Sequence, residues 1–512
     1  MRTSRGWWWL SGVVVGALGL GISYLVSGLL RVRESPPVAV AESIRDISPD
    51  GLVEWAKTNL GMADKLVVWI GIFVFLTVAF AAIGQLARSR WWFAVGGLVA
   101  LGAIATAAVV TRPSFVDLQL VPLVAGFVAW LVALTVITGA VRQWELVVAA
   151  DDDATDPTHS RRRFFATAGA VGGLAAAAAV LGRFAGNPRE EVERDRRLLR
   201  VDEVTKPTAP RGAKVDVPGV QPWQTPTDDF YLIDTTFVPP AIRVKDWVLR
   251  IHGKVQNEMT LSYDDLVARG ITEDWITLNC VSNQVGGDLV GNAWWSGVRL
   301  AGLLAEAGPD DDADAVLQTS EDGWTCGTPL GPMMDDRNAM LAVYMNGEPL
   351  TVEHGFPVRT LVPGLYGYVS ACKWVVDMEV TSFDEIEAYW TTRGWAEEGP
   401  VKIASRIDVP GSGESVSAGT IVCGGSAWKQ HTGIESVEVS LDGGAWTPAT
   451  LGRVPSDDTW VQWRAELEVE EGDHELRVRA IGKDGDVQTG VETDVLPNGA
   501  TGWHSVEFSA SA

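Results

Sequence analysis

The chain has 512 residues, which exceeds one typical domain, and combines a net charge of −24 with a hydrophobic fraction of 47%. These properties separate along the chain: the first 200 residues carry 20 basic and 16 acidic residues, and the remaining 312 carry 21 basic and 49 acidic residues. The acidic second part argues against nucleic acid as a partner, because phosphate binding needs basic patches.

The scarcity of lysine in this acidic part also fits a protein of haloarchaeal type, bathed in high salt. Salt screens the repulsion between like charges, so such a surface is tolerated there. An ordinary acidic exported protein is the alternative interpretation.

Five apolar stretches in the first part each approach the ~20 residues that a helix needs to cross a bilayer. They cover residues 7–30, 66–86, 91–110, 118–141 and 164–181. Arginines precede the first stretch, separate the second from the third, and separate the fourth from the fifth. The positive-inside rule then places the chain after residue 182 on the extracytoplasmic side. We therefore predict a multi-pass anchor in the cell membrane over residues 1–182.

The fifth stretch follows Ser160-Arg-Arg-Arg-Phe-Phe165, which resembles a twin-arginine signal for the export of folded proteins. A set of positive-inside arginines is the simpler interpretation, and the sequence leaves open whether the segment is cleaved. His159, in a loop, is the only histidine of the membrane part, so haem held by two intramembrane histidines is excluded there. Residues 183–228 are charged and proline-rich, which predicts a tether.

Cys280 stands at the end of an apolar run that covers residues 275–278. Polar, glycine-rich chain follows, and then residues 298–304 predict a helix. Gly286, Gly287 and Gly291 let the backbone approach a ligand closely, which suits a binding site beside Cys280. A buried structural cysteine is the alternative.

The whole stretch from Thr277 to Val298 resembles the cofactor-binding segment of the sulfite-oxidase superfamily of molybdopterin enzymes. In that family the cysteine at this point supplies a thiolate to molybdenum, for which a soft anionic donor is suited. The resemblance implies a molybdopterin (Mo) cofactor, with Cys280 as the metal ligand and catalytic residue.

Three further segments extend the resemblance from Asp229 nearly to the end of the chain. Residues 230–240 resemble the family's opening motif, 344–364 a pterin- and phosphate-binding segment, and 366–374 a third cofactor segment. Arginine suits phosphate because its planar fork donates two parallel hydrogen bonds. The resemblance implies cofactor-binding roles for Tyr231, Asp234, Cys280, His354, Arg359, Cys372 and Lys373.

The chain departs from the family pattern at several positions: Asp234 and Thr235 replace an asparagine and a histidine, and residues 283–287 lack the Asn-Arg-Arg of animal enzymes. Two further departures concern the substrate. Sulfite oxidases proper hold an arginine and a tyrosine close to the substrate anion, and this chain has Ile233 and Trp395 there. A pocket without cations binds a sulfite dianion poorly, because burying unpaired charge is costly. Arg243, Arg299 and Arg393 are the candidates for a replacement charge.

After residue 400 the chain changes to short alternating strands, at residues 420–423, 436–441, 460–469 and 474–481, separated by turn signals such as Asp442-Gly-Gly444. This pattern is typical of an immunoglobulin-like sandwich. Residues 425–428 and 437–444 resemble the family's dimerisation domain, which implies a homodimer.

We therefore predict a multi-domain chain with an N-terminal α-helical transmembrane region, an α+β sulfite-oxidase-type molybdopterin domain and a C-terminal immunoglobulin-like β-sandwich. The predicted parts are residues 1–182, a linker at 183–228, the catalytic domain at 229–398 and the sandwich at 399–512. The shift from apolar to charged and then to alternating sequence sets these boundaries.

The predicted function is oxygen-atom transfer on a small oxo compound, namely sulfite or an S- or N-oxide. Expected partners are the small-molecule substrate, membrane lipid and an external electron carrier such as a small copper protein, a cytochrome or another membrane subunit. A metal-free cell-surface binding protein that keeps the fold is the alternative. A transporter with an appended sensor domain ranks last, because the apolar stretches show no polar midplane site.

Overall fold

The computed structural model describes residues 5–30, 32, 35–49, 64–112, 115–150, 157–185, 188–200 and 204–512. The chain divides into two units. Residues 1–191 together with Thr236–Pro240 form the first, and Val192–Thr235 together with Ala241–Ala512 form the second.

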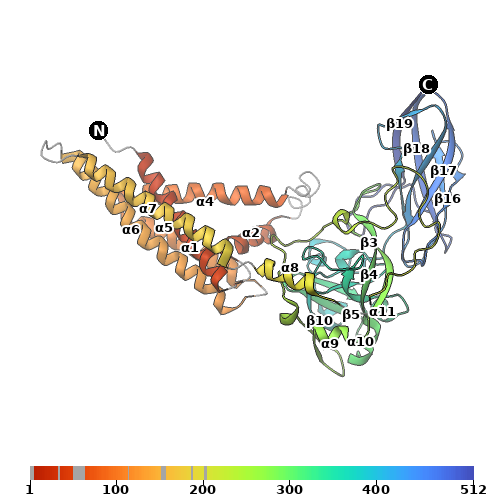
Figure 1. The fold of residues 1–512 in the computed structure, drawn as a ribbon, viewed down its shortest axis with the longest axis horizontal. Coiled ribbons are helices and arrows are strands. Elements are labelled where there is room, and N and C mark those ends of the chain that lie inside the picture. Colours follow the sequence, from red (N-terminus) through yellow and green to blue (C-terminus); the bar gives the residue numbers. More distant parts are fainter. Residues whose placement is uncertain are drawn as a thin grey trace. The chain divides into compact units, whose positions relative to one another are not determined.

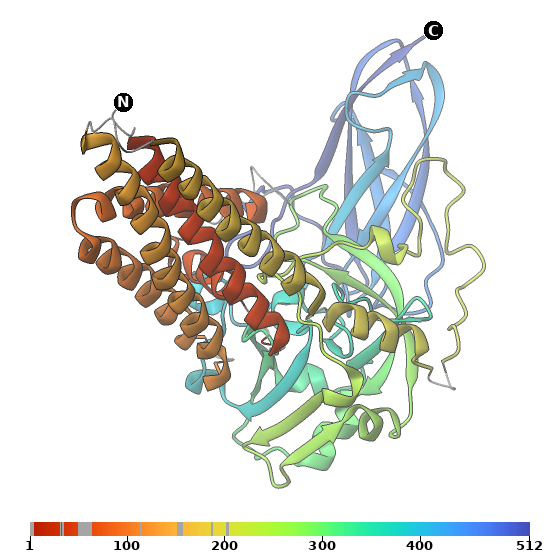
Figure 2. The same ribbon diagram turned by 60° about the vertical axis from the view of Figure 1, so that its left-hand side comes forward.

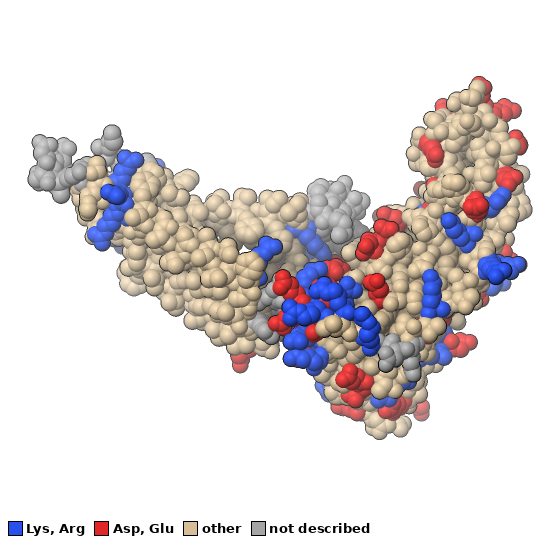
Figure 3. Space-filling model, viewed as in Figure 1, with Lys and Arg blue, Asp and Glu red and all other residues tan. Residues whose placement is uncertain are grey.

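The first unit is helical (Figure 1). Its helices are α1 (Arg5–Leu29), α2 (Pro36–Ile47), α4 (Asp64–Ser89), α5 (Trp91–Val110), α6 (Leu120–Ala150) and α7 (Pro157–Ala185). By length and composition, five helical segments of the described chain can cross a membrane, which agrees with the five predicted stretches. On the face seen in Figure 3, the flanks of these helices are largely free of charged side chains.

Small residues allow the helices of this unit to pack closely. α1 lies against α4, α6 and α7 (Figure 2). A Cβ added at Gly12 of α1 would clash with the backbone of Phe80 and Gly84 in α4. Close backbone approach through glycine is a common way for helices to associate in a membrane, where lipid offers no hydrophobic drive for association.

Two features of this region differ from the expectation. Helix α2 was not predicted, because its 12 residues are too few to cross a bilayer. The expected tether at 183–228 contains helix α8 (Pro188–Leu198), and Trp223 within it is buried in the second unit. The amide of Asn292 donates to the Trp223 carbonyl at 3.0 Å. Side-chain packing thus fixes part of a segment whose composition predicted an extended linker.

The second unit begins with an α+β domain built on two sheets. One has the order β2-β1-β10-β5-β6, and the other has the order β3-β4-β7-β8, with β9 paired to β7. The strands are β1 (Val248–Gly253), β2 (Met259–Ser262), β3 (Thr272–Asn279), β4 (Val290–Arg299), β5 (Ala315–Ser320), β6 (Thr325–Pro329), β7 (Met340–Met345), β8 (Glu348–Pro349), β9 (Arg359–Leu361) and β10 (Val375–Thr381). The helices are α9 (Tyr263–Val267), α10 (Leu300–Ala307), α11 (Leu330–Met334) and α12 (Gly367–Ser370).

Local signals explain several of these elements. Ser262 caps α9: its hydroxyl accepts from the Asp265 N–H, and the Asp265 carboxylate accepts from the Ser262 N–H. The helix expected at 298–304 is α10. Strand β4 was missed, because its glycines and Asn292 were interpreted as polar loop. Both faces of β4 are buried, with Trp294 in one hydrophobic cluster and Trp295 in another.

The C-terminal region is a sandwich of two sheets, with orders β11-β13-β17-β16 and β12-β19-β18-β14-β15 (Figure 1). The strands are β11 (Ala404–Val409), β12 (Ser415–Ser417), β13 (Gly419–Trp428), β14 (Ile434–Leu441), β15 (Thr447–Pro448), β16 (Thr450–Leu451), β17 (Val461–Val469), β18 (Gly472–Gly482) and β19 (His504–Ser511). One core joins the sheets, with Trp463 of β17 and Val478 of β18 both inaccessible to solvent. The four predicted strands are β13, β14, β17 and β18, and the two-layer β architecture is confirmed.

Candidate functional site

Cys280 lies immediately after β3, at the start of the hairpin that leads into β4. Its N–H donates to the Leu289 carbonyl at 2.9 Å, and its carbonyl accepts from the Asn283 N–H at 3.1 Å. The Asn283 side chain in turn accepts from the Leu289 N–H at 2.9 Å. The position of the thiol is therefore fixed by a hydrogen-bonded turn at the end of a buried strand.

The C-terminal sandwich holds the strand that delivers Cys280. The Gln430 amide donates to the Thr277 carbonyl at 3.0 Å and to the Asn279 side chain at 2.6 Å. The Thr277 hydroxyl accepts from the Trp460 N–H at 2.8 Å. These bonds are buried, so water does not compete with them.

The sandwich also holds the turn beyond the cysteine. Arg406 of β11 donates to the Gly287 carbonyl at 2.9 Å and pairs with the buried Asp408 at 2.8 Å. His504 of β19 lies so close to Gly286 that an added Cβ there would clash with its ring, and Gly286 has a φ of +76°. Only glycine both lacks the Cβ that would clash with His504 and readily adopts this positive φ. The C-terminal region is thus part of the framework of the site.

A second group of predicted residues gathers beside Cys280. Burial raises the pKa of Tyr231; the charge of nearby Cys280 raises it further, and that of Arg359 lowers it. Arg359 of β9 donates to the His354 carbonyl at 3.2 Å, and Lys373 pairs with Asp234 at 3.1 Å. Four segments of the chain therefore supply one cluster of charged and polar side chains, while their cofactor-binding roles stay a prediction.

The buried guanidinium of Arg359 has unused hydrogen-bonding capacity. Its side chain is 3% exposed, and its Nε–H has no acceptor among the described residues. Burial lowers the pKa of Arg359 to about 10, so the group stays charged at neutral pH. A buried cation with a spare donor fits an anionic ligand group such as the phosphate of a pterin cofactor.

His354 is neutral in this setting. Burial, and then the positive charges of Arg359 and Lys373, lower the pKa of His354 to about 4. Its Nε2 lies 3.1 Å from the Thr227 carbonyl, so this nitrogen carries the proton and donates. The other ring nitrogen remains an acceptor for a ligand N–H.

The Cys372 thiol is buried against neighbouring protein atoms. Its side chain is fully buried, and its thiol contacts the Lys373 carbonyl at 3.7 Å. Burial, and then the neighbouring Cys326, raise the pKa of the Cys372 thiol. All four cysteines of the chain are buried, and none of them forms a disulfide among the described residues.

Tyr366, at the N-terminal end of α12, was not predicted as a site residue. Burial raises the pKa of Tyr366 to about 12, with a smaller contribution from the charge of Cys280, which places the phenol in the electrostatic range of that thiol. Its oxygen accepts from the Lys402 N–H at 3.3 Å, while its own O–H has no acceptor among the described residues. The sequence signal was its position inside the third family-like segment.

The two departures from the family pattern lie in different surroundings. Ile233 is 45% exposed, whereas Trp395 is buried and packs against Tyr368 and Trp390. The three candidate replacement arginines have other contacts. Arg243 pairs with Asp195, Arg299 donates to the carbonyls of Asp336 and Arg337, and Arg393 lies over the ring of Tyr389.

Residues 236–390 match a family described as "Oxidoreductase molybdopterin binding domain". The chain is 34% identical over 180 residues to "Uncharacterized oxidoreductase YuiH" of Bacillus subtilis, covering 35% of this chain and 87% of that protein. It is 30% identical over 266 residues to mitochondrial sulfite oxidase of Homo sapiens, covering 43% of this chain and 48% of that protein. The chain thus spans about half the length of the human enzyme.

Two further similarities extend the comparison. Sulfite oxidase of Arabidopsis thaliana is 27% identical over 353 residues, covering 56% of this chain and 88% of that protein. The sulfane dehydrogenase SoxCD of Paracoccus pantotrophus aligns in structure with a TM-score of 0.47 and 24% identity, covering 57% of this chain and 80% of that one.

Replacing Arg406 by alanine will leave Asp408 buried without its partner and free the Gly287 carbonyl. We expect the variant to lose about 3–5 kcal/mol of unfolding free energy, as for other broken buried ion pairs. Chemical denaturation followed by circular dichroism measures the loss. The control is Arg464→Ala, whose exposed pair with Glu466 contributes less than about 1 kcal/mol. Equal losses of unfolding free energy in the two variants would contradict a stabilising role for the Arg406 contacts with Asp408 and Gly287.

The low pKa of His354 predicts a pH dependence of stability in protein prepared without cofactor. The unfolded chain binds a proton near pH 6.5 and the folded chain only near pH 4, so stability is complete above pH 6.5 and falls below it. Between pH 7 and pH 5 we expect this histidine to account for about 2 kcal/mol. Denaturation at both pH values measures it. Between pH 7 and pH 5, the variant His354→Gln should lose about 2 kcal/mol less unfolding free energy than the wild type. An identical loss in both proteins would argue against a neutral buried imidazole.

Proposed function

Because the chain belongs to the sulfite-oxidase superfamily of molybdopterin-dependent oxidoreductases, we propose that it transfers an oxygen atom to or from a small oxo compound, sulfite or an S- or N-oxide. The enzyme is a molybdenum-dependent oxidoreductase. The observation that carries the site proposal is the buried Arg359 with its unused donor, grouped with Tyr231, His354 and Lys373 beside Cys280.

The residues have distinct roles in this proposal. Cys280 supplies the thiolate to molybdenum, and the bound cofactor supplies the oxygen-transfer and one-electron chemistry. The anionic part of the cofactor lies against Arg359, while neutral His354 and the Lys373–Asp234 pair orient the pterin with Tyr231. Cys372 takes part through its backbone, because its thiol is buried against its own neighbours.

Tyr366 donates a hydrogen bond to the substrate in this proposal. Its O–H lacks an acceptor among the described residues, and it lies within the influence of Cys280. A neutral donor suits an S-oxide or N-oxide oxygen better than a free dianion, because a dianion needs cationic partners in a buried site. Ile233 and Trp395 offer no such charge, so the neutral oxo compounds are favoured over sulfite.

The setting of the enzyme is also part of the proposal. Helices α1 and α4–α7 anchor it in the cell membrane as a multi-pass protein, and the catalytic domain faces the extracytoplasmic side. Electrons pass to or from a separate carrier, for which a small copper protein or a cytochrome is suited. The sandwich is immunoglobulin-like and supports a homodimer, and the acidic surface fits a haloarchaeal type.

A metal-free binding protein with the same fold is the second candidate. Ile233 and Trp395 favour it, because they remove groups that sulfite oxidases use on their substrate. The retention of Cys280 beside the cationic cluster disfavours it, since a buried arginine without its anion is costly.

Changing Cys280 to serine tests the metal site directly. We expect the full chain in detergent, co-produced with cofactor biosynthesis, to contain about one molybdenum atom per chain, bound through one soft thiolate. Cys280→Ser will lose the metal or change its absorption and paramagnetic-resonance spectra, as measured with elemental analysis and spectroscopy. Cys423→Ser, at another buried cysteine in the sandwich, is the matched control. A folded wild type without molybdenum would support the metal-free binding protein instead.

Changing Tyr366 to phenylalanine tests the proposed donor. We expect kcat/KM for S-oxide or N-oxide reduction to fall about 10- to 100-fold, as for other lost transition-state donors. Molybdenum content will stay unchanged, because the residue does not bind the metal. Steady-state kinetics with an artificial electron donor measures the rate. The control is Tyr368→Phe, whose hydroxyl already donates to the Ala396 carbonyl at 2.7 Å. Unchanged kinetics in Tyr366→Phe would remove this residue from the mechanism.

A further inference from the structure

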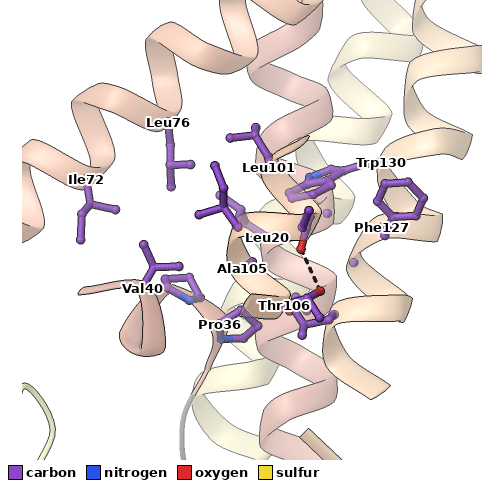
Figure 4. A pocket seen from close by; sticks show the side chains of 18 of the residues that line it. Leu20, Pro36, Val40, Ile72, Leu76, Leu101, Ala105, Thr106, Phe127 and Trp130 are labelled. Carbon is purple, nitrogen blue, oxygen red and sulfur yellow. Dashed lines mark hydrogen bonds between the residues drawn. The ribbon is translucent and has the colours of Figure 1, made fainter. Parts of the chain in front are cut away.

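The helical unit contains a large cavity that the proposed chemistry does not use. It has a volume of about 870 Å³ and lies between α1, α2, α4, α5 and α6 (Figure 4). Leu20, Ile72, Leu101 and Trp130, from four different helices, point toward it in Figure 4. Volumes of about 300–1,000 Å³ are usual for small-molecule sites, so the space is large enough for an organic ligand.

The lining of the cavity excludes charged ligands. None of the described residues that line it is Asp, Glu, Lys, Arg or His, and only Ser23 and Thr106 carry side-chain hydroxyls. An ion or a phosphorylated head group would leave its charge unpaired there, at a cost of several kcal/mol. The ligand is therefore uncharged and mainly apolar.

Ser23 of α1 supplies an unused polar group at the cavity. Its side chain is 5% exposed, and its Oγ has no hydrogen-bond partner among the described residues. A buried hydroxyl without a partner costs about 1–3 kcal/mol, which a ligand carbonyl would relieve. The Thr106 hydroxyl already donates to the Gly102 carbonyl at 2.8 Å, so Ser23 is the free donor of the two (Figure 4).

Aromatic rings lie close to the free donor. The Trp130 N–H is already bonded to the Gly16 carbonyl at 3.2 Å, so this side chain offers a ring face and no donor. Phe127 lies 6.4 Å from the Trp130 ring, between centroids. Gly19 and Gly126 allow the packing here, because an added Cβ would meet the Trp130 ring at the first and the Ser23 side chain at the second. A flat ring that carries a carbonyl fits such a wall, because aromatic rings stack on one another.

We propose that this cavity binds the head group and first isoprenoid units of a membrane quinone. A quinone combines an uncharged planar ring, carbonyl acceptors and an apolar tail. The proposal deepens the proposed function, on which it rests, by naming a lipid-soluble electron partner. In the reduction favoured above, a quinol gives up two electrons and two protons to become a quinone, and the oxygen of the S- or N-oxide leaves as water; oxidation of a substrate by water and quinone is the reverse.

The test compares quinone content among variants of the full chain, purified in mild detergent from a host that makes isoprenoid quinones. Bound lipid is extracted and resolved by chromatography with ultraviolet and mass detection, which separates quinone from phospholipid. Gly71→Phe fills the cavity from α4, where an added Cβ meets nothing within 4 Å. Gly96→Phe on α5 is the matched control, because its added Cβ is equally free and Gly96 does not line the cavity.

We expect near-stoichiometric quinone in the wild type and in Gly96→Phe, and at least a roughly tenfold loss in Gly71→Phe. Ser23→Ala, which adds no bulk, will retain the fold and lower the affinity for a short-chain quinone about fivefold in a titration. Phospholipid alone in the cavity, or equal quinone in Gly71→Phe and Gly96→Phe, would overturn the proposal.

Molybdenum measured in the same samples separates this proposal from the proposed function. Molybdenum without quinone leaves the enzyme intact and overturns the quinone site. Quinone bound in the absence of molybdenum overturns the enzyme and retains the cavity as a lipid-soluble ligand site.

Discussion

The site depends on one electrostatic constraint, the burial of the Arg359 guanidinium without an ion-paired carboxylate among the described residues. Burying this cation costs desolvation free energy, and its Nε–H has no acceptor among the described residues. The charge also affects its surroundings: burial, and then the positive charges of Arg359 and Lys373, lower the pKa of His354 and keep it neutral. In the proposed function, the anionic part of the cofactor removes this imbalance by pairing with Arg359.

The candidate cofactor-binding residues and the Cys280 thiol lie close together although they come from segments that are far apart in the sequence. The metal-ligand candidate follows β3, yet β3 and the turn after it are held by Gln430, Arg406 and His504 of the sandwich. The sandwich therefore contributes to the geometry of the site as well as to any subunit contact. We therefore expect a substitution in this part of the chain to disturb the turn that follows Cys280.

The helical unit contains the cavity that we propose as the site of a lipid-soluble electron partner. The cavity is apolar, and glycines allow close packing on one side of it. One hydroxyl there, that of Ser23, has no partner among the described residues. These features fit an uncharged ligand that carries a carbonyl group. An oxygen-atom transfer releases or consumes two electrons, the number that one quinone exchanges. In the proposal, the helical unit binds the electron partner and the α+β domain binds the molybdenum cofactor.

The sequence by itself determined the five long apolar helices, the family, the cofactor and the candidate residues around Cys280, because these depend on local hydropathy and on ordered motifs. It also determined four sandwich strands. Tertiary structure alone decided that β4 is a buried strand, that Trp223 packs within the supposed tether, that Tyr366 belongs beside the thiol and that Arg406 holds Gly287. Each of these depends on contacts between residues distant in the chain, and neither local propensity nor periodicity carries that information.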